Sequence, residues 1–302
     1  MSMRTDPHRP IGWSTLLVGA GVGLAAAWAS TLARPLPPLG AAGRVGMPLC
    51  APGERPGAAG RDDGVRTPDG LAISVRTPSD YDATHGYPLL VVYPPAGNSR
   101  VDSERFYGLT EEATRRGYVL AYSAAVSLSR RALALQQRVA ETVASRWCID
   151  TARLAFIGHS DGASVAQGVL LRGDAKALRP GHVLASAAGI RGADLQSERC
   201  PRPTRLTIVH GSRDELFPGY GRETARWWAG CFACAAAGRL DGQLAADTCI
   251  DLGPCREGGG VRYCEASEPH TRWPGVARHP FPYLGIAPGQ GPFAPSLVSR
   301  RS

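Results

Sequence analysis

The hydrophobic positions of the chain alternate between short continuous runs and a helical spacing over residues 71–275. Continuous apolar runs predict strands buried on both faces, and apolar positions three or four residues apart predict amphipathic helices. Strands are predicted at 71–75, as an edge strand, and at 88–93, 118–123, 154–157, 182–189, 205–210 and 261–265. Helices are predicted at 104–116, at 132–147 and from residue 163 onward. This alternation indicates an α/β fold with a mostly parallel central sheet and helices on both faces.

The N-terminal segment departs from this alternation. Residues 11–29 are predominantly apolar, follow Arg4 and Arg9, and end in the small-x-small sequence Ala27-Trp28-Ala29. These features are typical of a secretory signal peptide, which we place within residues 1–33. The apolar stretch also approaches the length that spans a bilayer, so an uncleaved N-terminal membrane anchor is the alternative. With either, we expect the body of the protein to lie outside the cytoplasm.

Two further segments lack periodicity. Residues 34–70 are rich in Pro, Gly, Ala and Arg and predict a flexible leader, pinned if Cys50 forms a disulfide. The tail from residue 276 to 302 is rich in Pro and Gly and lacks the apolar spacing of a closing helix. We therefore expect a single domain over residues 71–302, in which residues 229–266 form a cysteine-rich excursion.

The chain is basic, with 34 Lys+Arg against 26 Asp+Glu and a net charge of +8. The basic residues, of which Lys176 is the only lysine, are scattered rather than gathered in a stripe with aromatic residues between them. Nucleic-acid-binding surfaces have such stripes, so we expect a solvated basic surface and no nucleic-acid partner.

The eight cysteines agree with export, because an even number of cysteines in an exported chain indicates disulfides. Five of them lie within residues 231–264, and the sequence does not choose among the pairings. A zinc site is the alternative, because Cys231 and Cys234 have C-x-x-C spacing. No second close pair or nearby histidine completes a tetrahedral ligand set, so we expect neither a metal nor another cofactor.

Between the strand at 154–157 and the helix from residue 163 lies the sequence Gly158-His-Ser-Asp-Gly162. A Gly-x-Ser-x-Gly motif is weak evidence in a chain with 37 glycines, but a preceding strand and a following helix are the context that a nucleophile elbow requires. Such a turn exposes the hydroxyl above the strand ends, and the helix N-terminus favours negative charge there. We therefore predict Ser160 as a nucleophile, with an ordinary glycine-rich turn as the alternative.

A serine nucleophile needs a base and an orienting carboxylate, which follow it in the order acid, then histidine, on such folds. Asp214 comes just after the strand at 205–210, so we predict it as the acid rather than as a turn residue. His270, in the loop after the strand at 261–265, is predicted as the base. The poorer candidates are Asp241, Asp247 and Asp251 in the cysteine-rich excursion, His279 in the proline-rich tail, His159 as a packing or loop-shaping residue, and His210 as a structural residue at a strand end.

Four sequences are more specific together than any one is alone: Cys148-Ile-Asp150-Thr-Ala-Arg153, Gly158-His-Ser-Asp-Gly162, His210-Gly-Ser-Arg-Asp214 and His270-Thr-Arg-Trp273-Pro274-Gly275. Over residues 71–275 the combination resembles the extracellular polyhydroxybutyrate depolymerase and feruloyl esterase group of the α/β-hydrolases. The resemblance implies the α/β-hydrolase fold and a secreted serine esterase with Ser160 as nucleophile, Asp214 as orienting acid and His270 as base. It also implies that Trp273 lies near the substrate, although Arg272 is an extra residue in the group's His-x-Trp-Pro-Gly sequence.

The chain departs from the group at the oxyanion hole. One donor is expected to be the backbone N–H of Asp161, the residue after the nucleophile. The group takes the second donor from a His-Gly-x loop, where this chain has Tyr93-Pro94-Pro95-Ala96, and proline has no N–H. The Ala96 N–H and the Tyr93 hydroxyl are the candidates, and loss of one donor costs about 100- to 1000-fold in turnover.

Three functions fit these residues to different degrees. The leading hypothesis is hydrolysis of a carboxylic ester, monomeric or polymeric, whose acyl group is a hydroxyalkanoate or a phenolic acid. The alternative is a non-catalytic, surface-tethered binding protein that retains the hydrolase fold, motivated by the prolines of the oxyanion loop and the N-terminal anchor option. A peptidase with the same triad has no sequence feature in its favour, and the oligomeric state is left open.

Overall fold

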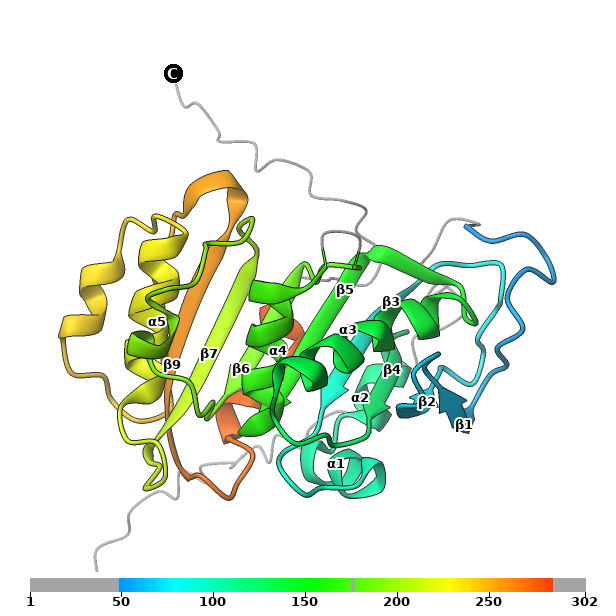
Figure 1. Ribbon diagram of the computed structural model, residues 1–302, viewed down its shortest axis with the longest axis horizontal. Coiled ribbons are helices and arrows are strands. Elements are labelled where there is room, and N and C mark those ends of the chain that lie inside the picture. Colours follow the sequence, from blue (N-terminus) through cyan, green and yellow to red (C-terminus); the bar gives the residue numbers. More distant parts are fainter. Residues whose placement is uncertain (1–48, 175–176, 285–302) are drawn as a thin grey trace, which may run out of the picture. The chain divides into compact units, whose positions relative to one another are not determined.

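The apolar runs of the sequence form one nine-stranded sheet in a computed structural model that describes residues 49–174 and 177–284 (Figure 1). Its strand order is β1-β2-β4-β3-β5-β6-β7-β9-β8, and the run from β4 through β9 is parallel, whereas β1, β2 and β8 pair antiparallel. The strands are β1 (Arg61–Arg66), β2 (Ala72–Arg76), β3 (Tyr87–Tyr93), β4 (Val119–Ser123), β5 (Ile149–His159), β6 (His182–Ser186), β7 (Arg205–Arg213), β8 (Thr248–Asp251) and β9 (Gly260–Pro269). Each strand predicted from an apolar run is therefore present.

Helices cover both faces of the sheet. They are α1 (Arg100–Tyr107), α2 (Thr110–Arg115), α3 (Arg130–Ala144), α4 (Asp161–Arg172), α5 (Tyr220–Cys231) and α6 (Phe281–Leu284), with short 3₁₀ helices η2 (Gly192–Leu195), η3 (Ala237–Asp241), η4 (Arg256–Gly258) and η5 (Gly275–Ala277). Figure 1 shows α3, α4 and α5 lying across the near face. Along β3, Leu89 and Val91 pack with these three helices, whereas Leu90 and Val92 pack with α1, α2 and α6. A strand buried on both faces explains the continuous apolar run.

Several elements differ from the predictions. The helix predicted at 104–116 is two helices, because Gly108 ends α1 in the left-handed region with φ of 62°. Strand β1 lies within the predicted leader, so the leader prediction is wrong for these six residues, and β2 is not the edge strand. Helix α5, whose last residues begin the cysteine-rich excursion, and strand β8 within the excursion were not predicted.

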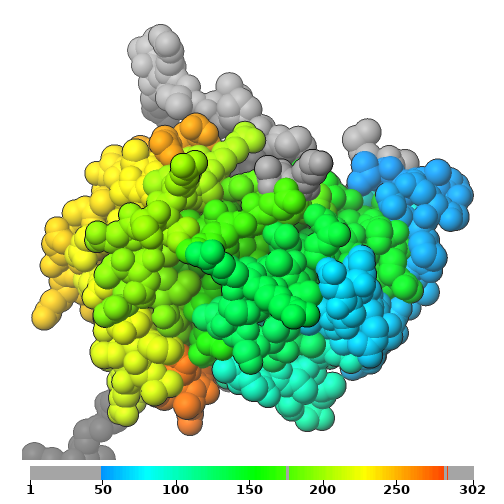
Figure 2. Space-filling view, viewed as in Figure 1, coloured from blue at the N-terminus to red at the C-terminus, as the bar shows by residue number. Residues whose placement is uncertain are grey.

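All eight cysteines are in disulfides, as the even number indicated. The pairs are Cys50–Cys148, Cys200–Cys231, Cys234–Cys255 and Cys249–Cys264. Three of the pairs lie wholly or partly in the excursion at 229–266, which Figure 2 shows in yellow to orange, with its yellow part at the opposite end of the visible face from the blue N-terminal strands. Because Cys231 and Cys234 are in different disulfides, the C-x-x-C pair provides no thiolates for a metal.

Some predictions concern segments that the structure does not describe. The signal peptide or anchor at 1–33 lies outside the described residues, as do the first part of the leader and residues 285–302 of the tail. Within residues 49–174 and 177–284, no helix combines the length and the apolar composition needed to cross a bilayer.

Candidate active site

Ser160 lies on a sharp turn between β5 and α4. Its backbone has φ of 54° and ψ of −121°, a conformation that residues with a side chain rarely adopt. A Cβ on Gly158 would lie 2.1 Å from the carbonyl carbon and oxygen of Gly162, and a Cβ on Gly162 would lie 2.3 Å from the carbonyl oxygen of Tyr93. Both motif glycines are therefore required by close backbone packing, which holds the strained serine in place.

The sheet brings the predicted acid and base together. Strands β7 and β9 are parallel neighbours in which Arg213 pairs with Pro269, so the residues that follow, Asp214 and His270, leave the sheet close to each other. His270 Nδ1 lies 2.8 Å from Asp214 Oδ2, and His270 Nε2 lies 2.9 Å from Ser160 Oγ. The three side chains thus form one hydrogen-bonded series, although they are far apart in sequence.

The carboxylate of Asp214 is fully buried and has both oxygens occupied. Oδ2 accepts from His270, and Oδ1 accepts from the backbone N–H groups of Leu216 and Phe217, each at 3.0 Å. Burial by itself would raise the pKa of Asp214, but the hydrogen bonds from His270 and Phe217 lower it overall, so the group remains ionised. An ionised acceptor at Nδ1 leaves Nε2 of a neutral His270 free to accept the Ser160 proton.

Of two other histidines, His210 occupies the structural position predicted for it, whereas His279 does not pack in the tail. His210 donates from Nε2 to the carbonyl oxygen of Phe217 at 2.8 Å, lies 3.7 Å from Asp214, and has a pKa lowered mainly by burial. It supports the acid loop without contacting Ser160. His279 is exposed and lies 2.8 Å from a carboxylate oxygen of Glu112, away from the series.

Tyr93 does not fit the oxyanion role considered for it. Its side chain is completely buried, and its ring lies 5.4 Å from that of Phe156 on the face covered by α3, α4 and α5. Burial raises the pKa of the Tyr93 hydroxyl strongly, and this hydroxyl has no hydrogen-bond partner in the described part of the chain. A substrate oxygen cannot reach it there, so Tyr93 is corrected to a core residue.

Two backbone donors remain for an oxyanion. Asp161 is the first residue of α4, where helix N–H groups have no preceding helical acceptor. Ala96 is exposed in a turn closed by a 3.2 Å hydrogen bond from Asn98 N to Pro95 O, and no described acceptor bonds to its N–H. This turn follows the end of β3, against which Gly162 packs, so both donors belong to segments that meet at the Ser160 turn.

Trp273 is packed in the core rather than open to a substrate. Its side chain is 6% exposed, and its ring centroid lies 4.7 Å from that of Tyr107 and 6.0 Å from that of His159. The substrate-contact role implied by the family resemblance is therefore not supported by its position. Trp273 instead supports the loop that carries His270.

Phe217 is a residue of the site that the sequence analysis missed. Its N–H donates to Asp214, its carbonyl accepts from His210, and its ring centroid lies 5.1 Å from that of His270. The preceding residue, Leu216, also donates its backbone N–H to Asp214, and its side chain is 63% exposed. An aspartate that binds the N–H groups two and three residues later is a recognisable turn pattern, so the sequence did contain a signal for this loop.

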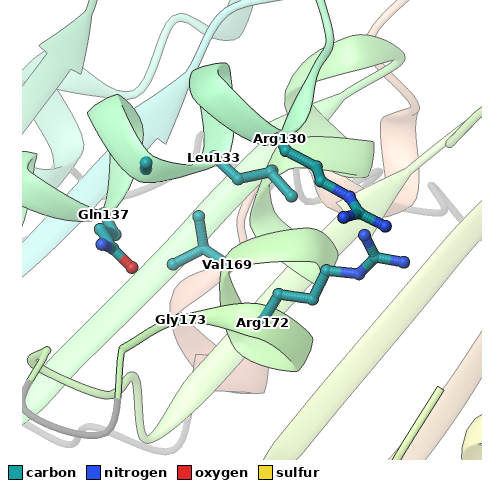
Figure 3. A pocket seen from close by; sticks show the side chains of 7 residues that line it. Arg130, Leu133, Gln137, Val169, Arg172 and Gly173 are labelled. Carbon is teal, nitrogen blue, oxygen red and sulfur yellow. The ribbon is translucent and has the colours of Figure 1, made fainter.

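A separate pocket of about 250 Å³ lies between α3 and α4 (Figure 3). Leu133 and Val169 contribute apolar surface, and the guanidinium groups of Arg130 and Arg172 point toward each other. Glu198 binds Arg172 in an ion pair. No residue of the Ser160, His270 and Asp214 series lines this pocket, so it is distinct from the candidate active site.

Comparisons with known proteins identify the fold. No protein-family model and no curated protein matches the chain. Among solved structures, an acetyl xylan esterase from Aspergillus awamori is similar over 76% of this chain and 99% of its own, with 14% identity and a TM-score of 0.54. The fluorophosphonate-binding serine hydrolase F of Staphylococcus aureus is similar over 74% of this chain and 96% of its own, with 9% identity and a TM-score of 0.52. An esterase from the Planctomycetes species Thermogutta terrifontis is similar over 74% of this chain and 89% of its own, with 14% identity and a TM-score of 0.51.

These similarities confirm the α/β-hydrolase fold predicted from the sequence. At identities of 14% or less, these similarities show the fold and not the activity or the substrate. The narrower resemblance to the polyhydroxybutyrate depolymerase and feruloyl esterase group stays a prediction.

Proposed function

We propose that this chain is a carboxylic ester hydrolase that works through an acyl-enzyme on Ser160. The observation that carries the proposal is the hydrogen-bonded series from Ser160 through His270 to Asp214, mounted on a strained turn at the end of a parallel strand. Solved structures with the same fold include esterases and a serine hydrolase, which agrees with this chemistry. The assembled series favours an enzyme over a non-catalytic binding protein with the same fold.

In the first half of the reaction, Ser160 Oγ attacks the ester carbonyl carbon while His270 Nε2 accepts the hydroxyl proton. The tetrahedral intermediate then collapses, the bond to the alcohol oxygen breaks, and His270 returns the proton to that oxygen. In the second half, His270 takes a proton from water, the hydroxide attacks the acyl-enzyme, and Ser160 leaves with the proton. Asp214 stays ionised throughout and stabilises the imidazolium that forms twice.

The developing oxyanion needs donors on the side of the carbonyl away from His270. We assign the backbone N–H groups of Asp161 and Ala96 to this role, because the former begins α4 and the latter is exposed in the turn beside it. The helix N-terminus adds a favourable partial positive charge at the same place. The prolines before Ala96 shift the donor along the loop relative to a His-Gly-x sequence.

The finer assignment concerns substrate and location. The family resemblance supports an extracytoplasmic esterase acting on a hydroxyalkanoate polymer or on a phenolic acid ester. The four disulfides support an oxidising compartment. The Phe217 ring beside His270 and the exposed side chain of the adjacent Leu216 support an apolar group in the substrate. Turnover of poly(3-hydroxybutyrate), methyl ferulate and short p-nitrophenyl esters, compared side by side, separates these classes.

The test of the proposal is Ser160→Ala, assayed with p-nitrophenyl butyrate. The expected loss in kcat is on the order of a million-fold, because removal of a triad serine removes the nucleophile. Ser145→Ala is the matched control, since Ser145 is an exposed residue at the C-terminal end of α3, and it should retain full activity. A loss of less than about tenfold in Ser160→Ala refutes the proposal. Without the serine, substrate binding and the oxyanion donors supply only about a thousandfold acceleration over the uncatalysed reaction in water, so they cannot sustain nearly wild-type turnover.

A further inference from the structure

His159, the residue before Ser160, is buried where three segments meet. Its side chain is 2% exposed, and its ring centroid lies 5.2 Å from that of Phe106 and 5.4 Å from that of His270. As the last residue of β5 it pairs in register with Ser186 of β6, whose carbonyl oxygen accepts from the Ser160 N–H at 2.9 Å. The position of His159 is therefore fixed by the same strand pairing that fixes the Ser160 turn.

Both ring nitrogens of His159 have hydrogen-bond partners. Nε2 lies 2.7 Å from the backbone carbonyl oxygen of His270, and Nδ1 lies 3.1 Å from the hydroxyl of Ser186. Burial lowers the pKa of His159 to about 4, so near pH 7 the ring is neutral and carries one N–H. Because a carbonyl oxygen can only accept, the proton is on Nε2, and Nδ1 accepts from the Ser186 hydroxyl.

The loop that carries His270 is otherwise bonded mainly to itself. Arg272 N donates to Pro269 O at 3.1 Å, and Gly275 N donates to a carboxylate oxygen of Glu268 at 2.7 Å. Among the described residues, no backbone N–H donates to the carbonyl oxygen of His270. The hydrogen bond from the His159 side chain to the His270 carbonyl therefore holds the backbone of His270 from outside the loop.

We infer that His159 is a positioning residue for the proposed hydrolysis, with its Nε2–H holding the backbone of His270 at a fixed place relative to Ser160. The inference rests on the proposed function. This hydrogen bond joins the end of β5, which carries the nucleophile, to the loop that carries the base. The 2.9 Å contact between Ser160 Oγ and His270 Nε2 therefore does not depend on the loop alone. A misplacement of about 1 Å at such a contact costs about 100-fold in rate.

Three substitutions separate anchoring from packing. His159→Gln can place an amide N–H near the position of Nε2 and keep the bond to the His270 carbonyl. His159→Asn is too short to reach that carbonyl but can still bond to Ser186. His159→Leu fills space and removes both bonds. We expect kcat for p-nitrophenyl butyrate to fall about 100-fold in the Asn and Leu variants and less than about tenfold in the Gln variant, with KM changed less than about threefold in each.

The matched control is His182 on β6, which is equally buried and bonds through Nε2 to the Thr207 hydroxyl at 3.0 Å, away from the active-site series. His182→Gln and His182→Asn should lower the melting temperature as the His159 variants do, yet keep kcat within about twofold. A folded His159→Asn with unchanged kcat overturns the inference, and so does an equal loss in the Gln and Asn variants. A rise in KM at unchanged kcat also overturns it, because it would indicate a substrate contact.

Ser160→Ala, measured in parallel, distinguishes the two failures. If Ser160→Ala retains activity, the proposed function fails and the His159 results have no bearing on an acyl-enzyme. If Ser160→Ala is inactive while folded His159→Asn is fully active, hydrolysis at Ser160 stands and only the anchoring role is overturned. The His159→Leu variant alone does not decide the matter, since it can lower the yield of folded protein; the Gln and Asn pair keeps both side chains polar.

Discussion

Replacing Asp214 by asparagine should change which nitrogen of His270 carries the proton while leaving the shape of the side chain almost unchanged. Oδ1 of Asp214 accepts from the N–H groups of Leu216 and Phe217, each at 3.0 Å. An asparagine amide keeps its oxygen at these two donors, because the reverse orientation would turn its NH₂ group toward two N–H groups. The NH₂ group then faces His270 Nδ1, which must accept, and the proton of the neutral ring moves to Nε2.

The cost of this wrong tautomer follows from the same contacts. Turning the amide around would lose two backbone hydrogen bonds worth about 1 kcal/mol each and would leave two buried donors unpaired, so the productive orientation lies roughly 2–4 kcal/mol higher. Only about one molecule in 30 to 1,000 would then hold a base able to accept the Ser160 proton. The loss of the carboxylate charge that stabilises the imidazolium adds to this. We expect kcat to fall about 10⁴-fold, as it does when a triad aspartate is replaced in other serine hydrolases, with KM little changed.

The measurement is kcat and KM for p-nitrophenyl butyrate hydrolysis by Asp214→Asn at neutral pH. Asp150→Asn is the control, because Asp150 pairs with Arg153 at 2.7 Å near the other end of β5 and should leave kcat unchanged. Thermal unfolding of each variant is measured in parallel to check that it is folded. If Asp214→Asn keeps more than a tenth of the wild-type kcat, or changes only KM, the orienting role of Asp214 is refuted.

Three further predictions concern the stability of the fold. Gly162→Ala should abolish activity and lower the melting temperature, because its Cβ would lie 2.3 Å from a carbonyl oxygen of β3. The control is Gly230→Ala in α5, whose Cβ would have no atom within 4 Å and which should stabilise the protein by up to about 1 kcal/mol. A Gly162→Ala variant with unchanged activity and melting temperature contradicts the steric reasoning. As pH falls from 7, His159 in the unfolded chain is protonated near pH 6.5, whereas the buried His159 of the folded protein has a pKa of about 4 and stays neutral. His159 by itself should therefore contribute a loss of about 3 kcal/mol in the free energy of unfolding between pH 6.5 and 4, in addition to the contributions of the other buried histidines. Chemical denaturation at pH 7 and 4.5 should show a smaller loss in His159→Gln than in the wild type, and equal losses count against the burial effect. Replacing Cys50 and Cys148 together by serine removes a link across a sequence separation of 98 and should cost about 2–4 kcal/mol in a urea titration; unchanged stability would show that the link does not constrain the unfolded chain.

The sheet was predictable because its parallel strands are buried on both faces, which leaves long apolar runs in the sequence. Strand β1 was missed for the opposite reason: it is an edge strand with a single buried residue, Val65, and its sequence is mostly charged. The break between α1 and α2 depends on the left-handed conformation of Gly108, which apolar spacing does not report. Local sequence therefore predicts the doubly buried parallel strands, but it misses the exposed edge strand β1 and the break at Gly108.

The site likewise has parts that the sequence predicts and parts that it does not. The approach of Asp214 to His270 was predictable from strand ends, because the order of acid and histidine along such folds places both at one edge of the sheet. The error at Tyr93 was avoidable, since it lies two residues from Val91 and four from Leu89 and thus shares their buried face. The bond between His159 and the His270 carbonyl joins segments 111 residues apart, and no local pattern encodes it.

The most direct test of the central claim is covalent labelling of the folded protein with a fluorophosphonate, followed by intact-mass measurement and peptide mapping. We predict a single adduct on the peptide that contains Ser160, no adduct in Ser160→Ala, and a much slower reaction in Asp214→Asn. If the folded wild-type protein gains no adduct, or if an adduct persists in Ser160→Ala at the wild-type rate, Ser160 is not an activated nucleophile and the proposed hydrolysis is contradicted.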